Sequence, residues 1–198
     1  MKNGNDNFAL VQRPPNAIEK SEPGAKRVIA MMISDTLAIA PKHLTPAFVP
    51  PTDAEIETWC QHGQKYYCGR GVSRDYVEAA KWFRKAAEQG LAAAQHNLGV
   101  YYRDGEGVPQ DYVEAVKWYR WAAEEGNACA QFNLGVCFQH GRGVKADRIE
   151  AYKLFSLAEA QGQKGAAEAV VSVGALLSLE ECQEAERRYN EYKAGHQT

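Results

Sequence analysis

The stretch "YYRDGEGVPQDYVEA", residues 101–115, contains two glycines, Gly105 and Gly107, in a pattern that could bind a phosphate. A glycine-rich loop lets backbone N–H groups approach an anion closely, and the N-terminus of a following helix adds a partial positive charge. The alternative is a simple turn between two helices. Other parts of the sequence distinguish these two interpretations.

No other group of residues predicts catalysis or metal binding. None of the histidines has a second histidine or a carboxylate at a convincing ligand spacing. The motifs of serine hydrolases, zinc proteases and P-loop proteins are absent, as are paired catalytic carboxylates. We therefore expect no catalytic residue, no cofactor, no metal and no enzyme activity.

Charge and cysteine usage favour an intracellular protein. Lys and Arg total 23 against 25 Asp and Glu, so the chain offers no basic surface to nucleic acid and no polybasic run to a membrane. The five cysteines include no CxxC pair, which favours reduced thiols. The start of the chain is polar, and the longest apolar stretch, residues 28–40, is too short to span a bilayer. We expect a cytoplasmic protein without a targeting or transmembrane segment.

An internal repeat decides the meaning of the glycine pair. Residues 60–90, 96–126 and 132–162 align without gaps, each 36 residues after the one before. Glycines recur at three sets of equivalent positions: Gly63, Gly99 and Gly135; Gly69, Gly105 and Gly141; and Gly71, Gly107 and Gly143. The Gly-x-Gly pattern always lies between two helical patterns and never follows a strand. We therefore interpret it as a turn and not as a phosphate loop.

Each unit contains two helical patterns. In the second unit, Ala94, Leu98 and Tyr102 are spaced four residues apart, with Gly99 beside them where a neighbour comes close. Gly105 suits the left-handed end of this first helix. The second helix begins at Asp111, its inner face carries Val113, Val116, Tyr119 and Ala123, and Trp118 flanks that face. Across the units, we expect Trp82, Phe83, Trp118, Tyr119 and Phe155 to carry much of the burial.

The stretch "LGVYYRDGEGVPQDYVEAVKWYRWAAEEG" resembles the Sel-one-like repeat family, whose helix pairs are related to tetratricopeptide repeats. The departures are few: His62 replaces a leucine in the first unit, and Leu154 and Glu159 replace a tryptophan and an alanine in the third. The resemblance implies an all-α, right-handed α-solenoid of about three full and one degenerate helix-turn-helix repeats, at residues 54–90, 91–126, 127–162 and 163–194. In the degenerate unit, Ser178 and Glu181 predict a capping box at the start of the last helix.

One branch of this family would imply an enzyme. Its cysteine-rich secreted members are linked to β-lactam binding and hydrolysis, and each of their repeats carries a disulfide. The second-helix cysteine of that branch corresponds here to Ala87, Ala123 and Glu159. Because the disulfide pattern is absent, we do not expect that activity.

The chain outside the repeats is predicted to contain a disordered tail (1–22), an amphipathic helix (23–41), a Pro-rich linker (42–53) and a second tail (195–198). The apolar stripe of the predicted helix consists of Val28, Ile29, Met32, Ile33, Thr36, Leu37 and Ala40. This helix caps the first repeat, pairs with another protein or with its own copy, or lies on a membrane surface. The last alternative is disfavoured because the polar face is not rich in Lys and Arg.

The outward positions of the first helices vary between units, whereas the scaffold positions stay fixed. First helices line the concave side of an α-solenoid, so this variation fits a binding groove, although exposed positions could also simply drift. The candidate partner-binding residues are Asn97, Tyr101, Asp104, Asn133, Cys137 and His140 on first helices and Trp121 on a second helix. Trp121 is equivalent to Lys85 and Leu157, which predicts an apolar strip across units two and three that a partner or the N-terminal segment covers.

The family resemblance implies a role in the assembly of multiprotein complexes. We expect a non-enzymatic adaptor that binds a partner protein or peptide in the concave groove. Two alternatives stay open: a small-molecule binder or hydrolase that uses the groove, and an oligomerisation module formed by the N-terminal helix.

Overall fold

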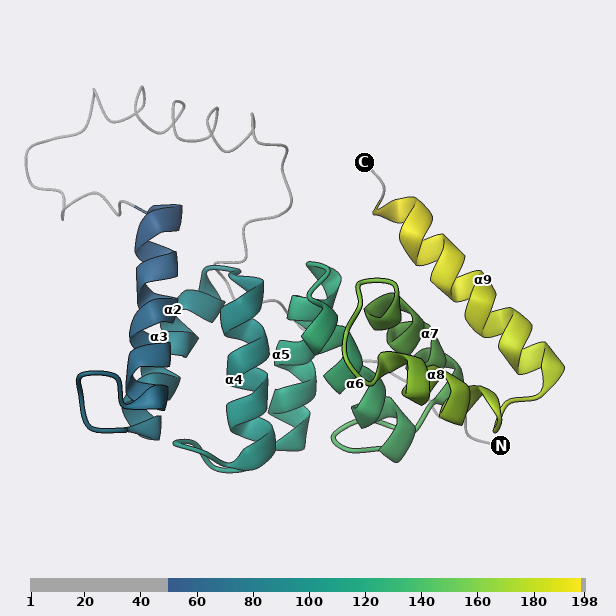
Figure 1. Ribbon diagram of the computed structural model, residues 1–198, viewed down its shortest axis with the longest axis horizontal. Helices are drawn as coiled ribbons and strands as arrows, with labels where there is room; N and C mark the ends of the chain where they lie inside the picture. Colours follow the sequence, from purple (N-terminus) through teal and green to yellow (C-terminus); the bar gives the residue numbers. More distant parts are fainter. Residues whose placement is uncertain (1–49, 197–198) are drawn as a thin grey trace, which may run out of the picture.

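The computed structural model describes residues 50–196. The predicted tail 1–22, the predicted helix 23–41 and residues 42–49 of the linker lie outside the described residues. Within residues 50–196 the chain forms eight helices and no strand. They are α2 (Asp53–Cys68), α3 (Tyr76–Glu88), α4 (Ala92–Asp104), α5 (Tyr112–Glu124), α6 (Ala128–His140), α7 (Arg148–Glu159), α8 (Ala166–Gly174) and α9 (Leu179–Gly195) (Figure 1).

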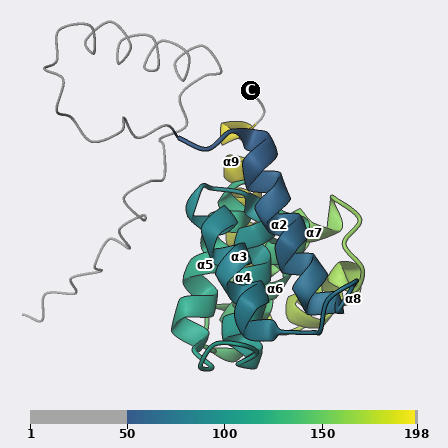
Figure 2. The ribbon, with the colours of Figure 1, turned by 90° about the vertical axis from the view of Figure 1, so that its left-hand side faces the viewer.

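The helices stack one after another into a solenoid. From α2 to α8, each helix packs on the next along the chain, and the closest contacts join the two helices of one unit. Figure 1 shows α2 at one end of the long axis and α8 and α9 at the other, and Figure 2 looks along the stack from the α2 end. The predicted all-α solenoid is therefore confirmed.

A glycine in each first helix lets an aromatic ring of the second helix approach closely. A methyl group on Gly99 would lie 2.6 Å from the ring of Tyr119, which is far inside van der Waals contact. The equivalent distances are 2.9 Å from Gly63 to Phe83 and 2.7 Å from Gly135 to Phe155. This glycine and ring pair closes the helical hairpin of the first three units.

The Gly-x-Gly turn has two structural roles. Gly105 ends α4 in the left-handed conformation, with φ at 72°. Gly107 has φ at 69°, and a methyl group on it would lie 2.2 Å from the carbonyl oxygen of Tyr76 in the preceding unit. The second glycine therefore brings the turn against the backbone of the neighbouring unit, and Asp111 then caps α5 by accepting from two backbone N–H groups.

The core runs along the stack. Tyr119 and Phe155 are among the largest fully buried side chains, and Phe83 and Trp118 are also buried, as predicted. Val113 contradicts the predicted inner face because it is 53% exposed. It lies in the first turn of α5, before the buried face of that helix begins at Ala115.

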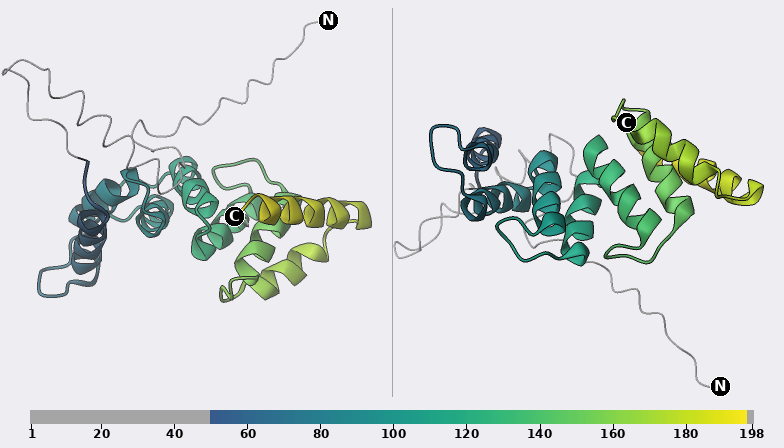
Figure 3. Two further views of the ribbon diagram at one scale, coloured as in Figure 1. Left: turned by 90° about the horizontal axis from the view of Figure 1, so that it is seen from above. Right: turned by 60° about the horizontal axis from the view of Figure 1, so that its bottom comes forward.

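The fourth unit has the two predicted helices but a different packing. Ser178 and Glu181 form the predicted capping box at the start of α9. α9, however, packs along α7 and not on α8, and the two helices diverge from their turn (Figure 3). The sequence explains the difference. Val171 stands at the position of Gly63, Gly99 and Gly135, and Glu186, eight residues after the N-cap Ser178, stands where the other units have an aromatic ring eight residues after an N-cap aspartate. The predicted degenerate helix-turn-helix unit is therefore present, and its two helices form an open hairpin.

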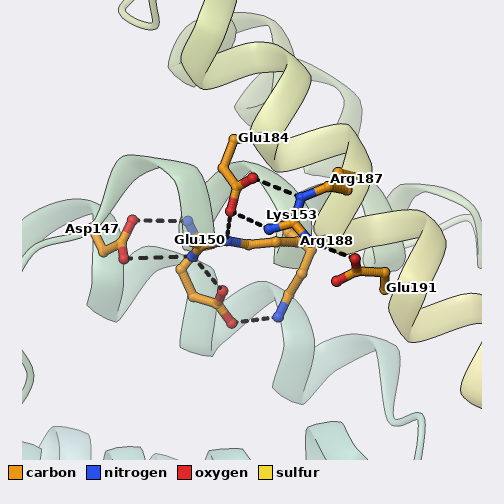
Figure 4. Close-up of polar contacts among 7 residues, drawn as sticks. All are labelled: Asp147, Glu150, Lys153, Glu184, Arg187, Arg188 and Glu191. Atoms are coloured by element: carbon orange, nitrogen blue, oxygen red, sulfur yellow. Dashed lines mark hydrogen bonds and ion pairs between the residues drawn. The ribbon is translucent and has the colours of Figure 1, made fainter.

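Polar contacts hold α9 against α7 (Figure 4). Across the contact, the Arg188 guanidinium of α9 lies 3.6 Å from Glu150 Oε2 of α7, and within α9 Arg188 Nε donates to Glu184 Oε1 at 2.7 Å. Hydrogen bonds from Arg187 and Arg188 hold the pKa of Glu184 at about 2, well below its ordinary value. Near the other end of α9, the Tyr192 hydroxyl donates to the Ala123 carbonyl at 2.9 Å, which ties α9 to the end of α5.

Candidate partner-binding surface

An open groove of about 460 Å³ lies between the first helices α2 and α4. We call it the first-helix groove, and it is lined by Gln64, Tyr67, Cys68, Arg70, Phe83, His96, Asn97, Val100 and Tyr101. Its lining combines aromatic rings with amides, an arginine and a histidine. This mixture is suited to a ligand that has both apolar side chains and hydrogen-bonding groups, such as a peptide.

Tyr101 forms the floor of this groove and not its rim. Its side chain is 3% exposed, and its ring packs 5.6 Å from Phe83 and 6.1 Å from Tyr67, between ring centroids. Burial raises the pKa of Tyr101, and its hydroxyl has no hydrogen-bond partner among the described residues. The predicted outward position of Tyr101 is therefore wrong, because this side chain packs between units one and two.

Cys137 occupies the equivalent position in the third unit and is buried in the same way, at 3% exposure. Burial raises the pKa of its thiol, which disfavours the reactive thiolate. The predicted outward position of Cys137 is therefore wrong. At the equivalent position in unit one, Lys65 is exposed, because no preceding unit of the described chain covers that side of α2.

Three predicted residues come together in a chain of polar contacts between α4 and α6. Asn133 Nδ2 lies 3.0 Å from His96 Nε2, and His96 Nδ1 lies 3.3 Å from Asn97 Oδ1. Arg103 donates to Asn133 Oδ1 at 3.4 Å and to both carboxylate oxygens of Asp104 at 2.7 Å. This arrangement fits a neutral His96 that accepts at Nε2 and donates from Nδ1. Burial, with a further contribution from the Arg103 cation, lowers the pKa of His96, whereas its hydrogen bond to Asn97 raises it.

The other two predicted residues lie apart from the groove. His140 is exposed at the end of α6, beside the turn that leads to α7. Trp121, on α5, is half-buried, and its ring packs edge-on against Trp118 at 4.7 Å between centroids. Trp121 therefore belongs to the layer formed by the second helices α3, α5 and α7, which we call the second-helix layer.

The predicted apolar strip is interrupted at both ends. Lys85 is exposed, and its ammonium lies 3.9 Å from the ring centroid of Trp59. Leu157 is buried and lines a cavity that Tyr192 of α9 also lines, so α9 lies over this end of the strip. The predicted cover of the strip is thus supplied in part by the C-terminal helix.

Two residues of the first-helix groove, Tyr67 and Arg70, are not among the partner-binding residues predicted from the sequence. Tyr67 is 45% exposed, one of the few large apolar side chains at the surface of the described chain. It lies in the last turn of α2, next to the turn glycines, and Arg70 lies between those glycines. The available signal was the run of tyrosines at positions 66 and 67, directly before the turn.

Within residues 50–196 there is no cluster of three or more His, Cys, Asp or Glu side chains that could hold a metal ion. Over the same residues, no helix has both the length and the hydropathy needed to cross a membrane.

Comparisons with known proteins agree with the fold. The Sel1 repeat model matches residues 60–91, 92–127 and 130–163. A protective antigen of uropathogenic Escherichia coli strains that displays an SLR fold is 33% identical, with a TM-score of 0.65 over 69% of this chain and 29% of its own. A Sel1 repeat protein from Oxalobacter formigenes is also 33% identical, with a TM-score of 0.58 over 74% of this chain and 58% of its own.

The chain thus spans less than two thirds of the length of each of these two structures. No curated protein matches it. Three matched units in register and two solved structures with the same fold lead to one conclusion: the chain belongs to the Sel1 repeat family.

Proposed function

We propose that this protein is a non-enzymatic scaffold that binds a partner protein or peptide along its first helices. The observation that carries the proposal is the first-helix groove, which opens between α2 and α4 and joins apolar and hydrogen-bonding side chains. Sel1 repeat proteins are commonly protein-interaction scaffolds, which supports the same function. We place this role in the cytoplasm and expect neither nucleic acid nor a membrane as the partner.

The groove offers two kinds of contact to a peptide. The half-exposed ring of Tyr67 and the side chain of Val100 supply apolar surface, and an aromatic anchor of this kind contributes much of the affinity of many interfaces. The amides of Gln64 and Asn97 supply donors and acceptors for a peptide backbone. Arg70 adds a cation, which favours a ligand with an acidic group.

The polar chain between α4 and α6 extends this surface along the solenoid. Asn97 belongs both to the groove and to the polar chain, so the two regions are continuous. Asp104 is exposed at the far end of the chain beside Arg103. A partner long enough to cross from α2 to α6 would therefore meet the apolar part first and the polar part second.

The test is affinity capture with the tagged full chain, followed by titration calorimetry with the purified partner. A groove variant, Tyr67→Ala with Asn97→Ala, removes surface side chains without emptying the core. We expect it to weaken binding about 10-fold or more, as loss of an aromatic anchor does.

The matched control is Val77→Ala with Lys81→Ala, which removes two exposed side chains from α3 on the second-helix layer. It should bind within about twofold of the wild type, because surface changes away from an interface have small effects. Equal binding by the groove variant, or equal weakening by the control, would place the interaction elsewhere on the molecule.

A further inference from the structure

The exposed large apolar side chains of the described chain gather at one end of the solenoid. Outside this end they are scattered singly over α2, α3 and α5. At the end formed by α8 and α9, Val171 is 73% exposed, Leu179 is 75% exposed, and Leu176 between them is also exposed. We call these three residues the α8 end patch.

The patch exists because the fourth hairpin is open. In the first three units, the glycine equivalent to Val171 lies under an aromatic ring of the second helix. In the fourth unit the ring is replaced by Glu186, and α9 lies on α7. The face of α8 that would pack against the second helix in a closed hairpin is therefore not covered by α9.

The opposite end of the solenoid has a different character. The α2 positions equivalent to the buried Ala94 and Leu98 are Thr58 and His62. Thr58 is exposed, and so is Lys65, which is equivalent to the buried Tyr101. A polar terminal unit of this kind needs no further helix in order to stay in solution.

We propose that residues 23–41 of a second copy of this chain pack as a helix on the α8 end patch. Forty-nine residues precede the described part, and they carry an apolar stripe that includes Val28, Ile33 and Leu37. A stripe of this width is buried when the helix is stable in water. The described α2 end presents threonine, histidine and lysine to it, whereas the α8 end presents valine and two leucines.

Charge supports the same pairing. Lys26 and Arg27 are the only cations of the segment and lie at its start. Glu168 on α8 and Glu180 on α9 are exposed on either side of the patch in the sequence. The segment can therefore place its apolar stripe on the patch with its two cations beside one of these carboxylates.

The position of the attachment point favours two copies. The segment joins the described chain at Pro50, beside α2, and α2 lies at the end of the long axis opposite to α8 (Figure 1). Exchange of the segment between two copies, each covering the other's patch, gives a closed dimer without a long linker.

The experiment uses the full chain, with light scattering over a concentration series and hydrogen exchange read out by mass spectrometry. We expect the wild type to dimerise, with amides in residues 28–40 exchanging at least about 10-fold slower in the dimer than in the monomer. Val171→Asp should give a monomer in which this protection is lost, and Ile33→Asp should do the same from the other side of the contact.

Val113→Asp is the matched control, since Val113 is also an exposed valine but lies on α5. It should leave the dimer and the protection unchanged. The proposal fails if residues 28–40 exchange as a free peptide does, if protection persists in a monomer, or if Val171→Asp and Val113→Asp behave alike. Because Val171 is exposed, circular dichroism should show the helical content of the wild type in the aspartate variant.

Discussion

In units one to three, an aromatic ring of the second helix rests on a glycine of the first, whereas in the fourth unit Val171 and Glu186 take these two positions. The three interior hairpins are closed, and α9 instead lies along α7. Both kinds of unit consist of two helices joined by a turn. The comparison shows that helix formation and hairpin closure depend on different residues of the repeat.

The consequence for function is a division of the molecule. The closed hairpins hold α2, α4 and α6 side by side, which creates the first-helix groove and the polar chain next to it. The open unit leaves α8 uncovered on one face and exposes the α8 end patch. One region is therefore suited to a ligand with polar groups, and the other to an apolar helix.

The largest expected difference in unfolding free energy between the two kinds of unit comes from substitutions at the aromatic ring position of the second helix. Tyr119→Ala should cost about 3–5 kcal/mol of unfolding free energy, because it empties a fully buried aromatic site. Glu186→Ala, at the equivalent position of the fourth unit, removes an exposed side chain and should change it by less than about 0.5 kcal/mol. Urea denaturation of the two variants measures both values. A Tyr119→Ala cost below about 1 kcal/mol would show that this ring does not close the hairpin.

Substitutions at the glycine position of the first helix should show a smaller difference in stability between the two kinds of unit. Gly99→Ala forces a methyl group to within 2.6 Å of the Tyr119 ring, so we expect a loss of about 1–3 kcal/mol from overpacking. Val171→Ala alters an exposed side chain and should stay within about 0.5 kcal/mol. Thermal unfolding of both variants checks this order. If Gly99→Ala is tolerated as well as Val171→Ala, close contact at this glycine is not required.

The repeat, its helices and its caps could be predicted because they depend on local chemistry. The turn glycines need positive φ, Asp111 and Ser178 accept from nearby backbone N–H groups, and Gly99 lies beside an apolar stripe. Each signal lies within a few residues of the structure that it predicts. The all-α solenoid follows from these signals together with the 36-residue spacing.

The candidate site was harder to predict because its exposure depends on neighbouring units. Tyr101 and Cys137 were taken as outward residues, but the contact between successive units buries both. The residue at the same position in unit one, Lys65, could have indicated this burial. A charged residue is tolerated at this position in α2 because no earlier unit of the described chain packs against that side of the helix. Asn97 and Asn133 were predicted at outward positions of first helices and are half-buried, and nothing local predicted their link through His96.

The contacts of α9 provide a test of the open unit at low pH. The pKa of Glu184 is depressed to about 2 by its two arginine partners, so its contribution to stability is present above the ordinary value of 4.5 and is lost as pH falls towards 2. The protection factors of the α9 amides, which correct for the intrinsic pH dependence of exchange, should therefore fall more than those of the α5 amides between about pH 6 and about pH 3. Glu184→Gln should reduce this difference, and an α9 insensitive to both changes would contradict a stabilising role for the ion pairs of Glu184 with Arg187 and Arg188 within α9 (Figure 4).

His96 provides the smallest expected effect, in the closed part of the molecule. Its pKa is lowered from 6.5 by burial, so the unfolded chain takes up the proton first and stability falls as pH falls below that value. The melting temperature of the wild type should drop more between about pH 7 and about pH 5 than that of His96→Gln, which places a polar amide that does not titrate at this site. If the assigned His96 resonance titrates at or above pH 6.5 in the folded protein, the account of a neutral ring between Asn97 and Asn133 is contradicted.

The most direct test of the comparison is a pair of spin-label distances that report where α9 lies. After replacement of the five cysteines, one pair of labels is placed at Ser156 and Asn190, which line the same cavity between α7 and α9. The other pair is placed at Ser172, on the exposed side of α8, and Asn190. An open fourth unit predicts the shorter distance for Ser156 and Asn190. A shorter distance between Ser172 and Asn190 would show that α9 folds back onto α8, and it would remove the basis of both the open unit and the α8 end patch.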